Sequence, residues 1–294
     1  MRISFTLTKF CLLLAIVFFS QAALAQFTAG NLALLRADGN AANNTTASII
    51  QINTSTANQA AITTTSISGT GANAIRVSGS ATSTGYMALS ADKSLLCFTG
   101  HNNTTTATNA NTLNPRAVVT LNAGATVNLA TTYTGTSGNQ TRCATTIDNT
   151  NFFIVDQGGI NTNNSTTSSP TGNYRAVKTF GGIQYVGSAA TTGAQVSTLS
   201  AITGGTVTGI PGLATNTAFT DFYLISSGSN GSSFDILYTT APTATTGVIA
   251  KYSLVTGSWV ANGTYTTSFG GFGLAAQKAG AGANLFTKIG RAHV

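Results

Sequence analysis

A paired-strand pattern recurs along the chain. Each copy has an apolar stretch, a turn containing Asp, Asn or Gly, and a second apolar stretch that carries an aromatic residue. The residues that mark the second stretches are Phe98, Phe153, Tyr185, Tyr238 and Phe286. Their separations are 55, 32, 53 and 48 residues, which average 47. A repeat of this length predicts a β-propeller, in which four-stranded antiparallel blades surround an axis.

The residue types agree with an all-β fold. The chain contains 53 Thr and 32 Gly but no Glu, and only 6% of its residues are charged. Helices need charged and straight-chain residues on their wet faces, whereas Thr, Val, Ile and aromatic residues favour strands. A helical protein is therefore excluded.

A second type of hairpin lies between some of these copies. Two alternating apolar stretches flank a short turn in each case, at 48–53 with 60–63, 116–121 with 126–129, and 248–254 with 258–265. We expect these stretches to form the outer two strands of a blade. The interval of 32 residues has no such hairpin, and its segment 158–172 is typical of a loop, so we expect a reduced blade there.

The first apolar stretch after the leader has no partner before it. Residues 31–36 align with the second strand of the repeat, so the first blade lacks its first strand. A propeller can supply that strand from its C-terminus, which removes the exposed edge between the first and last blades. We count about five blades and part of a sixth, and a propeller left open exposes two edges that can associate between molecules.

The N-terminus has the features of a secretory leader. Arg2 and Lys9 precede the apolar run 10–19, and Ala23-Leu24-Ala25 fits a cleavage site. The run is about half as long as a membrane span. We therefore expect a signal peptide at 1–25, no membrane span in the mature chain, and export to the cell surface, the medium or the periplasm.

The C-terminal residues have a different origin in our interpretation. The sequence 289–294 (IGRAHV) is what a common short-read sequencing adapter encodes when translated, and Lys288 fits its upstream bases. We therefore expect the propeller domain to cover 26–287, the tail 288–294 to be an artefact, and the parent protein to continue.

Two cysteines remain after removal of the leader, Cys97 and Cys143. An even number in an oxidising compartment permits a disulfide. Their positions within separate predicted strands favour two buried, unpaired thiols instead. Their spacing is not that of a metal or redox motif.

The basic net charge of +7 does not indicate a nucleic-acid partner. Four of the basic residues belong to the leader or the tail, which leaves nine basic residues against six Asp. The nine are scattered singly and form no basic run or stripe of the kind that binds nucleic acid.

Few residues are suited to catalysis. His101 is the only histidine before the tail and lies in a segment typical of a turn or rim, so the sequence offers neither a triad nor a histidine metal site, and we expect no metal and no cofactor. Asp38, Asp92 and Asp148 lie in predicted hairpin turns, where Asx hydrogen bonding explains them. The remaining Asp residues could line a pore mouth, so the candidate binding residues are Asp156, Asp221, Asp235 and His101.

Several segments resemble a family of secreted bacterial β-propeller-like proteins of uncharacterised activity. The segments are GNLALLRADG, SGSATSTGYMALSADKSLLCFTGHN, FGGIQYVGSAATTGAQVSTLSAITG and GVIAKYSLVTGSWVANGTY. The resemblance covers residues 30–287. It implies a closed, seven-bladed propeller on a longer chain that ends in a surface-sorting segment, and it implies no activity or catalytic residue.

Three classes of function follow from these observations. We favour a non-catalytic exported propeller that acts as a binding or adhesion module for a protein or glycan. The first alternative is a propeller-type hydrolase or lyase, which needs several of Asp92, Asp156, Asp221 and Asp235 within about 10 Å. The second is a structural Thr/Asn-rich β-solenoid, against which the period of 47 residues counts.

Overall fold

The structure of the protein, a computed structural model, is all-β. It describes residues 27–56, 60–190, 193–200, 205–213, 215, 219–228, 233–243 and 245–289. Within these residues the strands form six separate antiparallel sheets, which we number in chain order. Sheet 1 contains β1 (Asn31–Ala37), β2 (Ala47–Asn53) and β3 (Thr63–Ser66). Sheet 2 contains β4 (Ile75–Arg76), β5 (Ala88–Leu89), β6 (Leu96–Asn102), β7 (Arg116–Leu121) and β8 (Val127–Tyr133). Sheet 3 contains β9 (Thr141–Thr146), β10 (Phe152–Asp156) and β11 (Ile160–Asn161). Sheet 4 contains β12 (Tyr174–Phe180), β13 (Ile183–Ser188), β14 (Val196–Leu199) and β15 (Val207–Gly209). Sheet 5 contains β16 (Asp221–Ile225), β17 (Ile236–Pro242), β18 (Gly247–Val255) and β19 (Ser258–Thr267). Sheet 6 contains β20 (Gly271–Ala279) and β21 (Gly282–Ile289).

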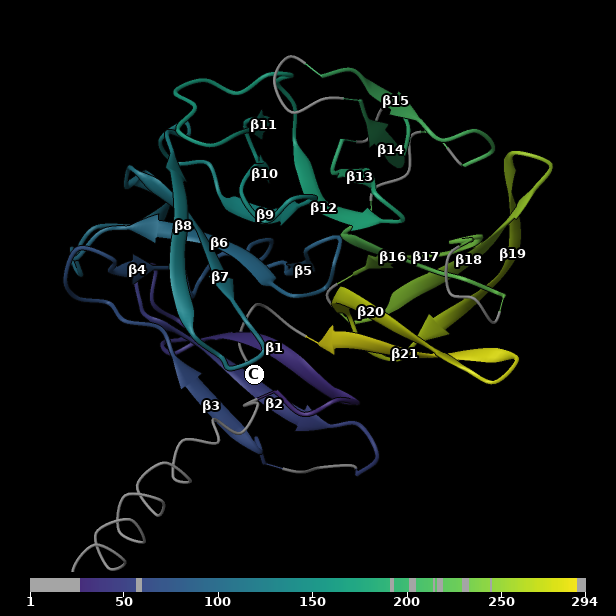
Figure 1. Cartoon of the computed structure of the whole chain (residues 1–294), viewed down its shortest axis with the longest axis horizontal. Coiled ribbons are helices and arrows are strands. Elements are labelled where there is room, and N and C mark those ends of the chain that lie inside the picture. Colours follow the sequence, from purple (N-terminus) through teal and green to yellow (C-terminus); the bar gives the residue numbers. More distant parts are fainter. Residues whose placement is uncertain are drawn as a thin grey trace, which may run out of the picture.

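The six sheets follow one another around an axis (Figure 1). The chain runs from sheet 1 round to sheet 6, and residues of β1 and β20 line the same central cavity. In sheets 4 and 5 the strand order is that of the sequence, and their first strands, β12 and β16, contribute to this cavity. This arrangement confirms the all-β propeller fold, and its separate sheets are not the stacked rungs of a solenoid.

Asp and Gly residues make the inner turns, as predicted. The carboxylate of Asp92 accepts hydrogen bonds from the Ser94 backbone N–H at 3.0 Å and from its hydroxyl at 2.8 Å, between β5 and β6. The Asp148 carboxylate accepts the backbone N–H groups of Thr150 and Asn151, between β9 and β10. Such local bonds satisfy the backbone where it reverses, so a short side chain with two oxygen atoms is favoured there.

The turn between β12 and β13 uses glycine instead. Gly181 and Gly182 have φ values of +59° and +77°. A two-residue hairpin of the favoured twist requires two successive positive φ angles, which side chains other than glycine adopt at a cost.

The outer hairpins also form as predicted, except that the second strand of the first one is Thr63–Ser66 rather than 60–63. They are the pairs β2–β3, β7–β8 and β18–β19. Sheet 3 is reduced, as predicted, since the segment after β10 contributes only the two-residue strand β11.

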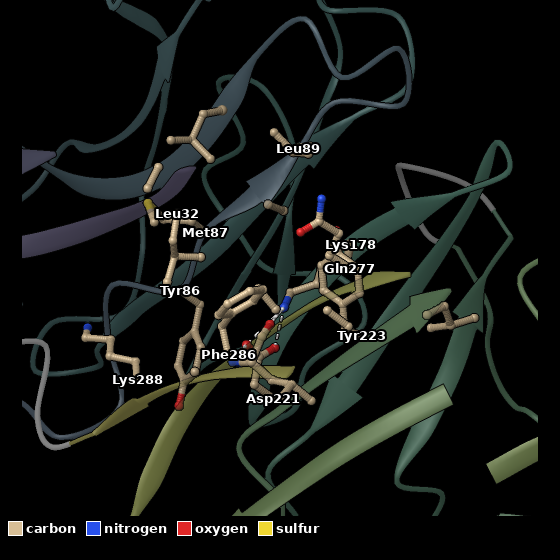
Figure 2. A pocket seen from close by; sticks show the side chains of 18 of the residues that line it. Leu32, Tyr86, Met87, Leu89, Lys178, Asp221, Tyr223, Gln277, Phe286 and Lys288 are labelled. Carbon is tan, nitrogen blue, oxygen red and sulfur yellow. Dashed lines mark hydrogen bonds and ion pairs between the residues drawn. The ribbon is translucent and has the colours of Figure 1, made fainter. Parts of the chain in front are cut away.

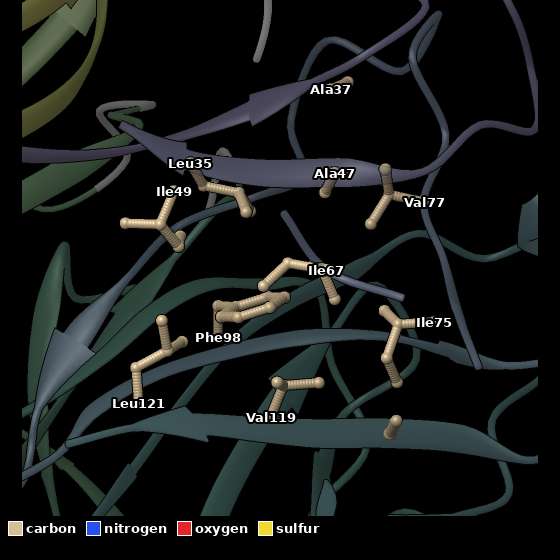
Figure 3. Packing of buried hydrophobic residues seen from close by; sticks show 11 residues of the cluster. Leu35, Ala37, Ala47, Ile49, Ile67, Ile75, Val77, Phe98, Val119 and Leu121 are labelled. Atoms are coloured by element: carbon tan, nitrogen blue, oxygen red, sulfur yellow. The ribbon is translucent and has the colours of Figure 1, made fainter. Parts of the chain in front are cut away.

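Each pair of consecutive sheets is held by buried apolar side chains. Figure 3 shows the contact between sheets 1 and 2, where Leu35 and Ile49 pack with Phe98, Val119 and Leu121. Corresponding clusters join sheets 2 and 3, sheets 3 and 4, sheets 4 and 5, and sheets 5 and 6. Burial of apolar surface stabilises each of these contacts, so each sheet is held mainly by the sheets next to it in the sequence.

The contact between sheets 1 and 6 differs from the contacts between consecutive sheets. No cluster of buried apolar residues joins them in the part of the chain that the structure describes. β1 pairs with β2 on one side and with no described strand on the other. Sheet 1 thus begins with an unpaired edge, as the missing first strand predicted.

The two cysteines are unpaired. Cys97 on β6 and Cys143 on β9 are fully buried, which confirms the favoured interpretation. Burial raises the pKa of each thiol to about 12.

The predicted signal peptide lies outside the described residues, as does most of the predicted tail. Lys288 and Ile289, at the start of that tail, pair with β20 as the end of β21. Among the described residues, no helix is long and apolar enough to cross a membrane.

Candidate functional site

A cavity of about 600 Å³ lies at the centre of the ring. Five of the six sheets contribute to its wall, through residues of β1, β5, β12, β16, β20 and β21. Most of the wall is apolar, and a few polar side chains reach it. A volume of this size is typical of sites that bind small molecules or short segments of chain.

A buried ion pair forms part of this wall. The ammonium of Lys178 on β12 lies 2.8 Å from the Asp221 carboxylate on β16 (Figure 2). The ammonium also donates to the carbonyl oxygens of Phe222 at 2.9 Å and Leu274 at 3.1 Å. The Leu274 backbone N–H in turn donates to Asp221 at 2.8 Å. Two side chains therefore connect the first strands of sheets 4, 5 and 6.

The surroundings of this pair combine low solvation with compensating partners. Burial raises the pKa of Asp221, and the Lys178 ammonium opposes that effect. Lys178 lies 5.4 Å from the ring centroid of Tyr223, within cation–π range. Because every charged atom has a partner, the pair can remain ionised at the edge of an apolar cavity.

The cavity has more positive than negative charge. Four lysines line it, whereas Asp221 is the only acidic side chain in its lining within the described residues; the lysines are Lys93, Lys178, Lys278 and Lys288. Lys278 donates to the carbonyl oxygens of Ser227 and Gly228. An acidic ligand is therefore better matched to the cavity than a basic one.

Another part of the wall is the edge of β1 that pairs with no described strand. The Asp38 backbone N–H donates to the Thr46 oxygen at 3.0 Å, which makes these two a hydrogen-bonded pair of the β1–β2 ladder. In an antiparallel ladder such pairs alternate. The N–H and C=O groups of Ala33 and Leu35 therefore point away from β2, and both residues line the cavity.

Asp156 lies in a separate buried network. Its carboxylate is 2.6 Å from the Arg116 guanidinium, and both side chains are fully buried. It also accepts the backbone N–H groups of Gly158 and Gly159, at 2.6 Å and 3.0 Å. Burial raises the pKa of Asp156 against the opposing effect of Arg116. Asp156 does not line the cavity.

The other two predicted residues are also absent from the cavity lining. Asp235 is half-buried in the loop before β17, where it accepts hydrogen bonds from the backbone and hydroxyl of Ser227. His101 is fully buried on β6, and its Nδ1 lies 3.0 Å from the Leu113 carbonyl oxygen. Burial lowers the pKa of His101 to about 4, and the nearby Arg116 contributes to this effect.

The four predicted residues are thus not brought together, and of them only Asp221 lines the cavity. Asp92 is likewise bound elsewhere, by Ser90 and Ser94 of its own turn and by Asn149 of the neighbouring one. Sequence analysis missed Lys178 as the partner of Asp221, because the two are 43 residues apart and on different sheets. The described residues also contain no group of three His, Cys, Asp or Glu side chains placed to hold a metal ion.

Comparisons with known proteins show no family. No family model matches the chain, and no curated protein matches it. Among solved structures, the chain is similar to a candidate 6-phosphogluconolactonase from Bacteroides fragilis, with 13% sequence identity and a TM-score of 0.44. The alignment covers 82% of this chain and 68% of that one. Similarity at this level carries no information about the activity of the present chain.

Proposed function

We propose that the protein is an exported binding module that takes an extended segment of a partner protein as an added strand on β1. The observation that carries the proposal is the edge of β1 in the wall of the central cavity, which pairs with no strand among the described residues. Addition of a strand satisfies the free N–H and C=O groups of the edge, and these main-chain bonds provide affinity. Side chains on alternate positions of the segment then enter the cavity and provide specificity.

The lining of the cavity defines the kind of segment that fits. Leu32 and Leu34 of β1, together with Phe180 and Phe286, offer apolar contacts. The excess of ammonium groups favours a segment that carries Asp or Glu. We therefore expect an apolar, acidic stretch of the partner rather than a basic one.

A glycan is the second candidate for the same cavity. The phenol ring of Tyr223 and the amide of Gln277 lie together in its wall (Figure 2). Sugars stack on aromatic rings and accept hydrogen bonds from amides, so these side chains support the alternative.

A catalytic role has less support. A propeller-type hydrolase or lyase requires neighbouring carboxylates, and Asp92, Asp156, Asp221 and Asp235 each belong to a separate network.

Two further parts of the proposal come from the sequence: export of the chain to the cell surface, the medium or the periplasm, and membership of the secreted propeller family. A second copy of the chain that pairs edge to edge is a further proposed partner.

The proposal is tested by selecting binders from a library of displayed seven-residue peptides. We expect enrichment of sequences that alternate apolar residues and contain an acidic residue. A synthetic peptide of the selected sequence is then titrated calorimetrically against the protein and two proline variants.

The first variant, Ala33→Pro, removes an N–H from the free side of β1 without removing a β1–β2 hydrogen bond. We expect it to lower affinity by at least about tenfold. The matched control, Thr64→Pro, places proline on the outward side of the edge strand β3, away from the cavity, and is expected to bind normally. Equal binding by Ala33→Pro, or failure to enrich any peptide, would overturn the proposal.

A further inference from the structure

Two arginine residues occupy equivalent irregular positions in neighbouring sheets. In sheet 3, Cys143 pairs with Val155 but Thr141 pairs with Asp156, so Arg142 is the extra residue of a β-bulge on β9. In sheet 4 the register shifts in the same way on β12, where Arg175 is the extra residue. Each arginine is the second residue of its strand. Bulges redirect side chains and are frequent beside binding sites.

The packing of the strands brings these two positions together. The Cys143 thiol donates to the Val177 carbonyl at 3.3 Å, and the Thr145 and Thr179 hydroxyls are 3.0 Å apart. The same register, continued toward the starts of the two strands, places Arg175 beside Thr141, the residue next to Arg142. The like charge of Arg175 contributes, after burial, to lowering the pKa of Arg142 to about 10.

Tyr86 is the third member of the group. Its backbone N–H donates to the Arg142 carbonyl oxygen at 3.2 Å. Its hydroxyl is buried near the Arg175 guanidinium but makes no hydrogen bond of good geometry with it. Tyr86 also lines the central cavity, so the group adjoins that cavity.

Several polar atoms of this group lack hydrogen-bond partners in the part of the chain that the structure describes. The Arg142 side chain is only 2% exposed, and its Nε and Nη1 have no hydrogen-bond partner. The Nε of Arg175 and the Tyr86 hydroxyl are buried without partners as well. A buried donor left unsatisfied is costly, and for a charged group the cost is larger.

No carboxylate of the described chain neutralises the two arginines. Asp156 and Asp221 are the nearby acids, and they form ion pairs with Arg116 and Lys178. The positive charges of Arg142 and Arg175, near the starts of β9 and β12, therefore have no carboxylate partner among the described residues. Arg175 is only partly buried, so solutes can reach the group from solvent.

We propose that Arg142, Arg175 and Tyr86 form a binding site for one oxyanion group: phosphate, sulfate or carboxylate. The anion accepts charge-assisted hydrogen bonds from both guanidinium groups and a further bond from the Tyr86 hydroxyl. It satisfies the buried donors and removes the repulsion between the two cations. This site does not depend on strand addition to β1.

The test is calorimetric titration of the full chain with inorganic phosphate, sulfate and acetate, at ionic strength matched with chloride. We expect saturable binding of at least one of these oxyanions, and the comparison among them shows which geometry the site prefers. Arg175→Gln is expected to weaken that binding by about tenfold or more, because a charge-assisted bond is lost. Lys251→Gln, which removes a positive charge on β18, is the matched control and is expected to bind normally.

Stability without the anion separates binding from a structural role. In chloride buffer Arg175→Gln is expected to be at least as stable as the wild type, because a like-charge neighbour is removed. Addition of the oxyanion should then raise the thermal unfolding midpoint of the wild type more than that of the variant. Absence of saturable binding by all three oxyanions below about 10 mM would overturn the proposal. Unchanged affinity of Arg175→Gln would do the same.

Discussion

At the scale of single residues, buried charge is the costliest feature of the molecule. Two ion pairs, Arg116–Asp156 and Lys178–Asp221, are almost inaccessible to solvent. Each connects residues that are 40 or more apart in the chain. Such pairs contribute little to net stability when complete, but loss of one partner leaves a charge that the interior cannot solvate.

Lys178→Met should therefore lower the free energy of unfolding by about 3–5 kcal/mol, because Asp221 is left without its cation. The double variant Lys178→Met/Asp221→Leu should recover most of that loss, since it removes both charges. Urea denaturation of the two variants measures the difference. Equal destabilisation in both would show that the charge is not the cause.

His101 predicts a dependence of stability on pH. Its folded-state pKa of about 4 lies below the ordinary value of 6.5, so the unfolded chain takes up a proton at a higher pH than the folded one. Stability is fully present above pH 6.5 and is lost as the pH falls toward 4, by about 3 kcal/mol in total. Urea denaturation at pH 7 and pH 4.5 measures this loss.

His101→Gln supplies the control for that experiment. Without a titrating imidazole, the variant should lose less stability between pH 7 and pH 4.5 than the wild type does. The Asp residues bound in turns titrate below this window, because their hydrogen bonds hold the pKa values of Asp92 and Asp148 below the usual range. Parallel pH profiles of variant and wild type would exclude His101 as the source.

At the scale of strands and sheets, local chemistry made most elements predictable. The turns at Asp92, Asp148 and Gly181-Gly182 are determined by side chains or φ angles within the turn itself. The bulges at Arg142 and Arg175 were not predictable, because they depend on register with a neighbouring strand. Sequence analysis treated both arginines as scattered single charges, since only the ring brings them together.

The alternation of hydrogen bonds along β1 predicts a contrast between two adjacent prolines. Leu34→Pro removes an N–H that bonds to β2, so we expect a loss of about 3 kcal/mol or more. Ala33→Pro removes an N–H on the free side and should cost much less. Thermal unfolding of both variants measures the contrast. Equal losses would show that Ala33 is also hydrogen bonded in solution.

At the scale of the whole molecule, stability depends on contacts between neighbouring sheets. Sheets 2 to 5 each have an apolar cluster on both sides, whereas sheets 1 and 6 have one each. The end sheets can therefore open while the middle of the ring remains folded.

Hydrogen exchange should follow this order. We expect backbone amides of β20 and β21 and of β1 to β3 to exchange first, and those of β6, β9 and β12 to exchange last. Mass spectrometry of peptic fragments measures the order. A single common rate of opening in all six sheets would contradict the prediction and indicate one cooperative unit.

The two buried thiols provide natural chemical reporters of these openings. Cys97 belongs to the apolar cluster between sheets 2 and 3, and Cys143 to the cluster between sheets 3 and 4. An alkylating reagent requires a thiolate in contact with solvent, and both thiols are buried and remain protonated at neutral pH. Each cysteine can be alkylated only while its own interface is parted. The rates of labelling at Cys97 and Cys143 therefore report how often sheets 2 and 3, and sheets 3 and 4, separate from each other, without any engineered probe.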